Sequence, residues 1–183
     1  GTATPIAKPD EDELLKNNSF EIFSAGSFAN WTSWKGNKGN TKFEQVAGRT
    51  GKAAKITVDD DNNIVNLYQE LKLDPTLEYT FSVWVKTEDI KLQWAGAQGV
   101  YLNFKYNNNV ILMSKPIAAD SNWQKLELKV NGGILQGDEW GVSLDGAGEY
   151  LTGVIYVDDA SVKVTGKGTP IAAEHPDEKL QNS

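Results

Sequence analysis

The sequence predicts an all-β domain, a jelly-roll β-sandwich of two antiparallel sheets. Short segments of alternating apolar and polar residues follow one another along the chain, and turn residues separate them. There are 17 glycines and many Asn and Asp turns, while residues 20–165 show no sustained helical periodicity. About eight to ten short strands at this spacing form a sandwich or barrel. In a closed fold of this kind, we expect the first and last strands to lie side by side.

The first expected strand begins at Leu14 and contains Glu21, and the last covers residues 154–164 and contains Asp158 and Asp159. Alternation gives several of the intervening strands one apolar and one polar face. The strands expected between the two ends are residues 52–58, 64–73, 77–87, 99–106, 110–113, 123–130 and 140–144.

The composition excludes several classes of function. The 183 residues are enough for one domain with a core of its own. Because there is no cysteine, disulfides, thiolate zinc sites and cysteine nucleophiles are excluded. A net charge of −7 argues against nucleic acid and anionic membranes as partners. No apolar run approaches the ~20 residues of a membrane span. Neutral ligands and cations remain as partners.

A repeated motif near the two ends predicts the domain organisation. Thr4-Pro5-Ile6-Ala7 recurs as Thr169-Pro170-Ile171-Ala172, and a Pro-Asp-Glu sequence follows each copy. Linkers rich in Pro, Ala and acidic residues separate tandem modules while remaining solvated. We therefore expect a linker over residues 1–13, one module over 14–166, and a linker over 167–183 that leads to a second, similar module. The chain would be a monomeric module excised from a longer protein.

Several sequence motifs, taken in order, resemble carbohydrate-binding modules of the group that contains families 4, 9, 16 and 22. The motifs are Leu-Leu-Lys-Asn-Asn-Ser-Phe-Glu from Leu14, the Trp31/Trp34 pair, Leu-Glu-Tyr-Thr-Phe-Ser-Val-Trp-Val-Lys from Leu77, Asn-Trp-Gln-Lys-Leu from Asn122, and Val-Ile-Tyr-Val-Asp-Asp-Ala-Ser-Val from Val154. The likeness covers residues 14–165 and is strongest to the family 16 modules of bacterial mannanases and cellulases.

This resemblance implies a jelly roll with a structural calcium ion between its first and last strands and a glycan groove on its concave sheet. It implies no catalysis. Such a module holds a separate glycoside hydrolase on β-1,4-linked glucan or mannan, which raises the local substrate concentration. It also implies that the parent protein is secreted or lies at the bacterial cell surface.

Tryptophans are the first candidates for sugar contacts, because aromatic faces match the apolar faces of pyranose rings and are stiff. Trp31 and Trp34 stand in a polar loop, and Trp140 stands among small and acidic residues at a strand start. At least one of Trp31 and Trp34, together with Trp140, is the expected stacking platform. Trp84 and Trp123 belong to alternating strands, where packing is the better interpretation, and Trp94 is left open between the two roles.

Amide and phenol groups are the second set of candidates, because sugar hydroxyls both donate and accept hydrogen bonds. The alternative for each is an ordinary solvated position on a sheet. The residues expected to contact sugar in this way are Gln69, Gln93, Gln98, Tyr101 and Asn103.

Carboxylates within apolar strands are the candidates for calcium. Glu21, Asp158 and Asp159 offer hard oxygen ligands, and Lys52 could add its backbone carbonyl. A buried carboxylate without a partner costs several kcal/mol, so a cation beside it is physically reasonable. The alternative is a solvated strand edge, and the choice between the two Asp residues is open. An EF-hand-like spacing over residues 59–70 is interpreted as a turn, since Ile64 stands where the sharp bend needs Gly.

Enzymatic activity is not expected. The single histidine, His175, falls in a predicted linker, which argues against histidine-based triads and most zinc chemistry. A glycosidase needs only two carboxylates, but nothing in the sequence singles out a pair. The alternative to a carbohydrate-binding module is a calcium-stabilised β-sandwich that serves as a spacer or a cell-surface interaction domain in a tandem array.

Overall fold

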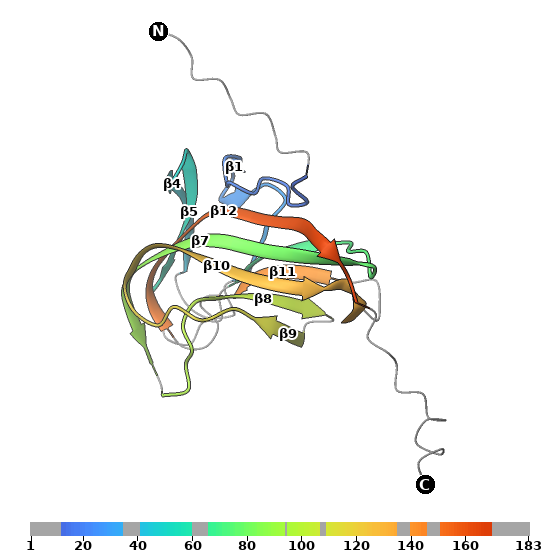
Figure 1. Cartoon of the computed structure of the whole chain (residues 1–183). Coiled ribbons are helices and arrows are strands. Elements are labelled where there is room, and N and C mark those ends of the chain that lie inside the picture. Colours follow the sequence, from blue (N-terminus) through green and yellow to red (C-terminus); the bar gives the residue numbers. More distant parts are fainter. Residues whose placement is uncertain are drawn as a thin grey trace, which may run out of the picture.

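The computed structural model describes residues 12–34, 41–59, 66–93, 95–106, 109–134, 140–145 and 151–169, and these form a β-sandwich (Figure 1). One five-stranded antiparallel sheet, the β7 sheet, has the order β10-β7-β12-β5-β4, and the other, the β6 sheet, has the order β3-β6-β11-β8-β9. The predicted all-β fold of two antiparallel sheets is confirmed. Among the described residues there is no helix that could cross a membrane.

The β7 sheet contains the two longest strands, which pair along most of their length. Its strands are β4 (Lys42–Ala47), β5 (Lys52–Val58), β7 (Leu77–Leu92), β10 (Ser121–Asn131) and β12 (Leu151–Lys167). The β6 sheet is made of β3 (Thr32–Trp34), β6 (Asn66–Leu71), β8 (Tyr101–Tyr106), β9 (Asn109–Met113) and β11 (Trp140–Asp145). A two-stranded hairpin of β1 (Phe23–Ser24) and β2 (Ser27–Phe28) precedes them, and a 3-10 turn, Gly132–Ile134, follows β10.

The core lies between the two sheets, where alternation turns the apolar faces of the strands inward. Phe81 of β7 and Phe104 of β8 are both almost completely buried, and their rings meet edge to face with centroids 5.6 Å apart. Burial of each such side chain contributes roughly 1.5–3 kcal/mol. In β8 the buried Leu102 and Phe104 leave Tyr101 and Lys105 on the opposite side of the strand. The second face of the β6 sheet is therefore free to carry polar groups.

The expected pairing of the first strand with the last is wrong. Residues 15–19 form turns, and β12 pairs with β5 and β7. Asn17 and Phe20 have φ angles of 49° and 58°, so the backbone cannot remain extended through this segment. The segment still lies beside β12, because Leu14 N donates to Val162 O and Ala160 N donates to Asn18 O. The two ends of the domain are thus adjacent, as predicted, but through loop contacts.

Most other predicted strands are found at or near the expected bounds, and β5 is found where it was expected. Three pieces have no counterpart among the predictions: β4, β3 and the β1–β2 hairpin. Strand β3 and the β1–β2 hairpin are too short to show an alternating pattern. Residues 60–65 of the EF-hand-like stretch lie outside the described residues, and residues 66–70 belong to β6. Trp94, His175 and most of both predicted linkers also lie outside the described residues.

Candidate functional site

The face of the β6 sheet that points away from the core collects several polar and aromatic residues in rows across the strands; we call it the outward face. One row runs through Trp34, Asn66, Asp145 and Tyr101, which stand opposite one another on β3, β6, β11 and β8. The next row runs through Thr32, Tyr68, Ser143, Asn103 and Met113. Register therefore brings three of the predicted sugar-binding residues, Trp34, Tyr101 and Asn103, onto one face of the sheet. Asn103 is completely buried there, so only Trp34 and Tyr101 of the three are accessible to a ligand.

Trp34 is the most accessible aromatic residue of this face. It lies at the end of β3, an edge strand, and 50% of its surface is exposed. Tyr101 is half-buried at the start of β8, three strands away. At about 4.8 Å between neighbouring strands, the two residues stand roughly 14 Å apart. An extended ligand that lies across the strands could therefore contact both.

Two polar residues of the outward face lie beside these aromatic residues, Asn66 opposite Trp34 and Asn103 two residues after Tyr101 on β8. Asn66 is half-buried, and within the described part of the chain its Oδ1 is enclosed without a hydrogen-bond partner. An enclosed acceptor without a partner costs about 1–3 kcal/mol, which a ligand hydroxyl or a water would recover. Asn103 is buried on the same face. Sequence reasoning missed Asn66, Tyr68 and Glu70, although their alternation along β6 would have marked them as residues of one face.

Trp31 is held differently from Trp34, although only three residues separate them. Its Nε1 donates to the Asn17 carbonyl oxygen over 2.9 Å, and its ring stacks on Phe20 with centroids 5.0 Å apart. Trp31 also packs against the core and is half-buried. Its hydrogen-bonding group and one ring face therefore serve the fold, which leaves Trp34 as the better placed platform of the pair.

We expect Trp31→Phe to lower the free energy of unfolding by about 1 kcal/mol, because the stack on Phe20 survives while the hydrogen bond to Asn17 is lost. Urea unfolding followed by circular dichroism measures this change. If the variant instead keeps its stability and loses an oligosaccharide ligand, Trp31 serves binding and not folding.

Gln69 serves the fold as well. Gln69 is only 7% exposed, and its amide makes two hydrogen bonds with one residue. Lys16 N donates to Gln69 Oε1 over 2.8 Å, and Gln69 Nε2 donates to Lys16 O over 3.0 Å. This pair attaches the N-terminal segment to β6. Both polar atoms of the amide are therefore already used.

The remaining predicted sugar contacts are dispersed. Gln93 follows β7 and donates to Thr152 Oγ1 over 3.2 Å, so it belongs to the other sheet. Gln98 is exposed in the loop before β8. Trp140 starts β11 opposite Leu71 and Tyr106, in phase with Val142 and Leu144 and out of phase with Ser143. By register, Trp140 therefore belongs to neither of the two rows of the outward face.

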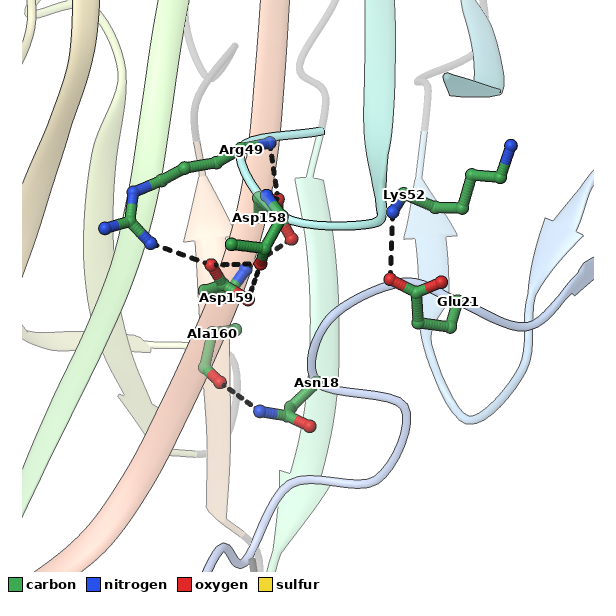
Figure 2. A network of polar contacts seen from close by, with 8 residues as sticks. Asn18, Glu21, Arg49, Lys52, Asp158, Asp159 and Ala160 are labelled. Atoms are coloured by element: carbon green, nitrogen blue, oxygen red, sulfur yellow. Dashed lines mark hydrogen bonds and ion pairs between the residues drawn. The ribbon is translucent and has the colours of Figure 1, made fainter. Parts of the chain in front are cut away.

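The acidic residues predicted for calcium lie around the turn that joins β4 to β5 (Figure 2). Asp158 is completely buried on β12, and every hydrogen bond that it accepts comes from backbone N–H groups: Arg49 N at 2.8 Å and Thr50 N at 3.2 Å to Oδ2, and Asp159 N at 2.7 Å to Oδ1. Burial and, to a smaller extent, the negative charge of Asp159 raise the pKa of Asp158, the backbone hydrogen bonds lower it, and the net result is a pKa of about 6. Asp158 is thus a buried carboxylate to which no cationic side chain is bound in the described part of the chain.

Asp159 has a cationic partner of its own. Its Oδ2 accepts from Arg49 Nη1 over 2.9 Å, and Thr50 Oγ1 lies 3.0 Å away. The guanidinium of Arg49 also stacks over the ring of Trp84, 3.7 Å from the ring centroid. Asp159 occupies a bulge of β12 with a φ of 45°. Trp84 is therefore a packing residue beneath this ion pair.

Glu21 and Lys52 lie on the other side of the same turn. Lys52 N donates to Glu21 Oε1 over 2.9 Å. A Cβ at Gly48 would lie 2.5 Å from Asp158 Oδ2 and 2.6 Å from the Lys52 carbonyl oxygen, so both oxygens line the space beside Gly48. Within the described residues, no three acidic or histidine side chains lie close enough to hold a metal ion together. The donor chemistry fits a hard cation if carbonyl oxygens and water complete its coordination.

Comparison with known proteins gives a likeness of fold. No family model and no curated protein matches the sequence. Among solved structures, a CBM4 module has a TM-score of 0.60 at 19% identity, with 82% of this chain and 99% of that chain covered. The C-terminal family 22 carbohydrate binding module of Clostridium thermocellum Xyn10B has a TM-score of 0.54 at 18% identity, with 88% and 99% covered.

Two further structures extend this likeness. TmCBM61, solved in complex with β-1,4-galactotriose, has a TM-score of 0.52 at 18% identity, with 84% of this chain and 99% of that chain covered. The enzymatically active domain of the bacteriophage CBA120 tailspike protein 4 has a TM-score of 0.60 at 11% identity, but the match covers 84% of this chain and only 22% of that chain. The chain therefore has the β-sandwich fold that carbohydrate-binding modules of families 4, 22 and 61 share.

Proposed function

We propose that this chain is a non-catalytic carbohydrate-binding module whose outward face binds a β-1,4-linked polysaccharide, glucan or mannan. The observation that carries the proposal is the row of residues from the exposed Trp34 to Tyr101. Trp34 stacks on one sugar of the bound chain, and Tyr101 contacts a sugar farther along it. The likeness of fold to modules of families 4, 22 and 61 supports this assignment.

Polar groups on the same face match the ligand. The half-buried side-chain amide of Asn66 and the phenol of Tyr68 each offer a donor and an acceptor to sugar hydroxyls. Glucose and mannose differ only at the 2-position, so contacts that avoid this position would admit both chains. Because the face is open to water and its contacts are few, we expect dissociation constants that are micromolar or weaker.

The biological role follows from tethering. A module without catalytic groups contributes by holding an attached glycoside hydrolase on its insoluble substrate, which raises the effective concentration of cleavable bonds. Solved relatives of the fold include a family 22 module joined to the GH10 module of a Clostridium thermocellum xylanase. This role places the parent protein outside the cell, where polysaccharide is available.

The same proposal includes a structural calcium ion. Asp158 is the expected ligand, since burial leaves it with backbone N–H partners alone, and the Lys52 carbonyl and Glu21 are the other candidates. Asp159 is expected to remain with Arg49. Bound calcium would supply the positive charge that a buried carboxylate lacks and would fasten the N-terminal segment to the β4–β5 turn and β12.

Isothermal titration with cello-, manno-, xylo- and β-1,4-galacto-oligosaccharides of about five units tests the proposal. We expect heat from the cello or manno series, with a dissociation constant in the micromolar range or weaker. Repeating the titration with a chelator separates a structural ion from one that contacts the sugar. If no ligand of the four series gives heat, the binding proposal is wrong, and a spacer or cell-surface interaction domain becomes the better interpretation.

A further inference from the structure

A hollow of about 560 Å³ lies beside the outward face, on the flank of β6. Thr32 and Glu70, which alternate with core-facing residues, connect it to the outward face. Its other walls include Lys16 and Asn30 from the N-terminal segment and Lys72 from the end of β6. The hollow is therefore continuous with the surface proposed to bind sugar, although it is separate from the Trp34 row.

The hollow exists because β3 is shorter than β6. The two strands pair only from Trp34 and Asn66 to Thr32 and Tyr68. Beyond this point the Gln69 amide holds the backbone of Lys16, so a loop instead of a strand borders the end of β6. The loop stands off from the strand, which leaves the last residues of β6 with an open side.

The polar side chains of the hollow are free to bind a ligand. Within the described part of the chain, no hydrogen bond or ion pair involves the side chains of Asn30, Thr32, Glu70 or Lys72. Together with Lys16 they offer both donors and acceptors, which suits sugar hydroxyls. Leu14, 39% exposed, adds an apolar surface of the kind that the carbon face of a sugar contacts.

The position of the hollow defines how a ligand reaches it. A main chain bound along the Trp34 row runs across the strands, whereas the hollow lies along the strand direction from that row. Thr32 is two residues from Trp34, and Glu70 is four residues from Asn66, which correspond to about 7 and 13 Å at about 3.3 Å per residue. A group that leaves the main chain near Trp34, at an angle to it, would enter the hollow.

We propose that the hollow binds a neutral sugar branch of the polysaccharide whose main chain lies on the outward face. The inference rests on the proposed function, because the branch reaches the hollow only from a main chain at Trp34. A neutral branch is favoured over an acidic one, since the carboxylate of Glu70 lines the hollow with the two lysines and offsets part of their charge, and the chain carries a net charge of −7. The module would thus prefer decorated chains to linear ones.

Paired titrations test this preference. Mannopentaose is compared with mannopentaose that carries one α-1,6-linked galactose, and cellotetraose with its xylose-branched form. We expect the branched member of at least one pair to bind about five- to tenfold more tightly, as two additional hydrogen bonds would provide. Equal or weaker binding of both branched ligands overturns the branch site while linear binding still supports the proposed function. Absence of binding by all four ligands overturns both.

Variants locate the preference in the hollow. Lys16→Ala/Lys72→Ala should lower the affinity for the branched ligand to that for the linear one and leave linear binding within about twofold. Lys91→Ala/Lys129→Ala, which removes two exposed lysines from the β7 sheet, is the matched charge control and should leave the preference intact. Equal loss of branched binding in both double variants, or an unchanged preference in the first, contradicts the proposal. Thermal unfolding confirms that both variants fold.

Discussion

Trp34→Ala is expected to weaken binding of the preferred linear oligosaccharide by about 30-fold or more, because it removes the exposed platform of the outward face. Truncation of an aromatic residue that carries a main contact with a ligand typically costs 2 kcal/mol or more, and about 1.4 kcal/mol corresponds to a tenfold change. Since half of the side chain is already exposed, the free energy of unfolding should change by no more than about 0.5 kcal/mol. Titration calorimetry and urea unfolding measure the two quantities independently.

Ile22→Ala is the matched control for this experiment. Ile22 is also a large exposed apolar residue, 61% accessible, and it lies next to the β1–β2 hairpin, outside the outward face. Its truncation should change neither binding nor stability appreciably. If Trp34→Ala binds as the wild type does, stacking at β3 is excluded. A loss of affinity in both variants would instead indicate binding through scattered apolar surface.

Calcium is expected to raise the thermal stability of the domain strongly at pH 7 and weakly at pH 5, because the ion binds the ionised form of Asp158. Burial raises the pKa of this carboxyl from 3.8 to about 6 in the folded chain. In the presence of a chelator, protonation of this carboxyl stabilises the folded chain, because the folded state binds the proton more tightly than the unfolded state does. This contribution to the free energy of unfolding is complete below about pH 4 and is lost as the pH rises through 6. This loss amounts to roughly 2–3 kcal/mol. Stability in chelator should therefore fall from pH 5 to pH 7, and calcium should reverse that trend.

Melting temperatures at pH 5, 6 and 7, with calcium or with a chelator, test this dependence. Asp158→Asn should remove both the effect of calcium and the fall of stability with pH. Asp159→Asn should retain the calcium effect and lose at most about 1 kcal/mol, since its ion pair with Arg49 is partly exposed. Should Asp159→Asn abolish the calcium effect while Asp158→Asn keeps it, the assignment of the ligand is reversed. A calcium effect of equal size at pH 5 and pH 7 argues against Asp158 as well.

The strands that the sequence predicted well are those whose alternation continues over many residues. β5 begins at Lys52 and ends at Val58 as expected, and the apolar side of β7 forms one wall of the core. Two-residue and three-residue strands such as β1 and β3 cannot show a period, so local patterns do not reveal them. The left-handed backbone at Asn17 and Phe20 likewise depends on side-chain contacts made in the folded chain, and this is why the expected first strand is absent.

The sequence predicted several residues of the candidate site, but it did not predict which of them lie together. Trp34, Tyr101 and Asn103 meet on one face because register across four strands brings them together, and no local pattern specifies that register. Gln69 has the same chemistry as a sugar-binding amide, yet it holds Lys16. The sequence did not predict Asn66, because the enclosure of its Oδ1 arises only in the folded chain.

By itself, the sequence determined the class of fold, because strand periodicity and turn residues are local properties that each segment carries with it. It also determined which chemistries were available, through the absence of cysteine and the abundance of tryptophan and carboxylates. Only the tertiary structure decided which of those groups face solvent together and which are used internally. Trp31 and Trp34 show the reason, although only three residues separate them. Folding brings Phe20 and the Asn17 carbonyl against Trp31, while Trp34 at the end of β3 remains exposed.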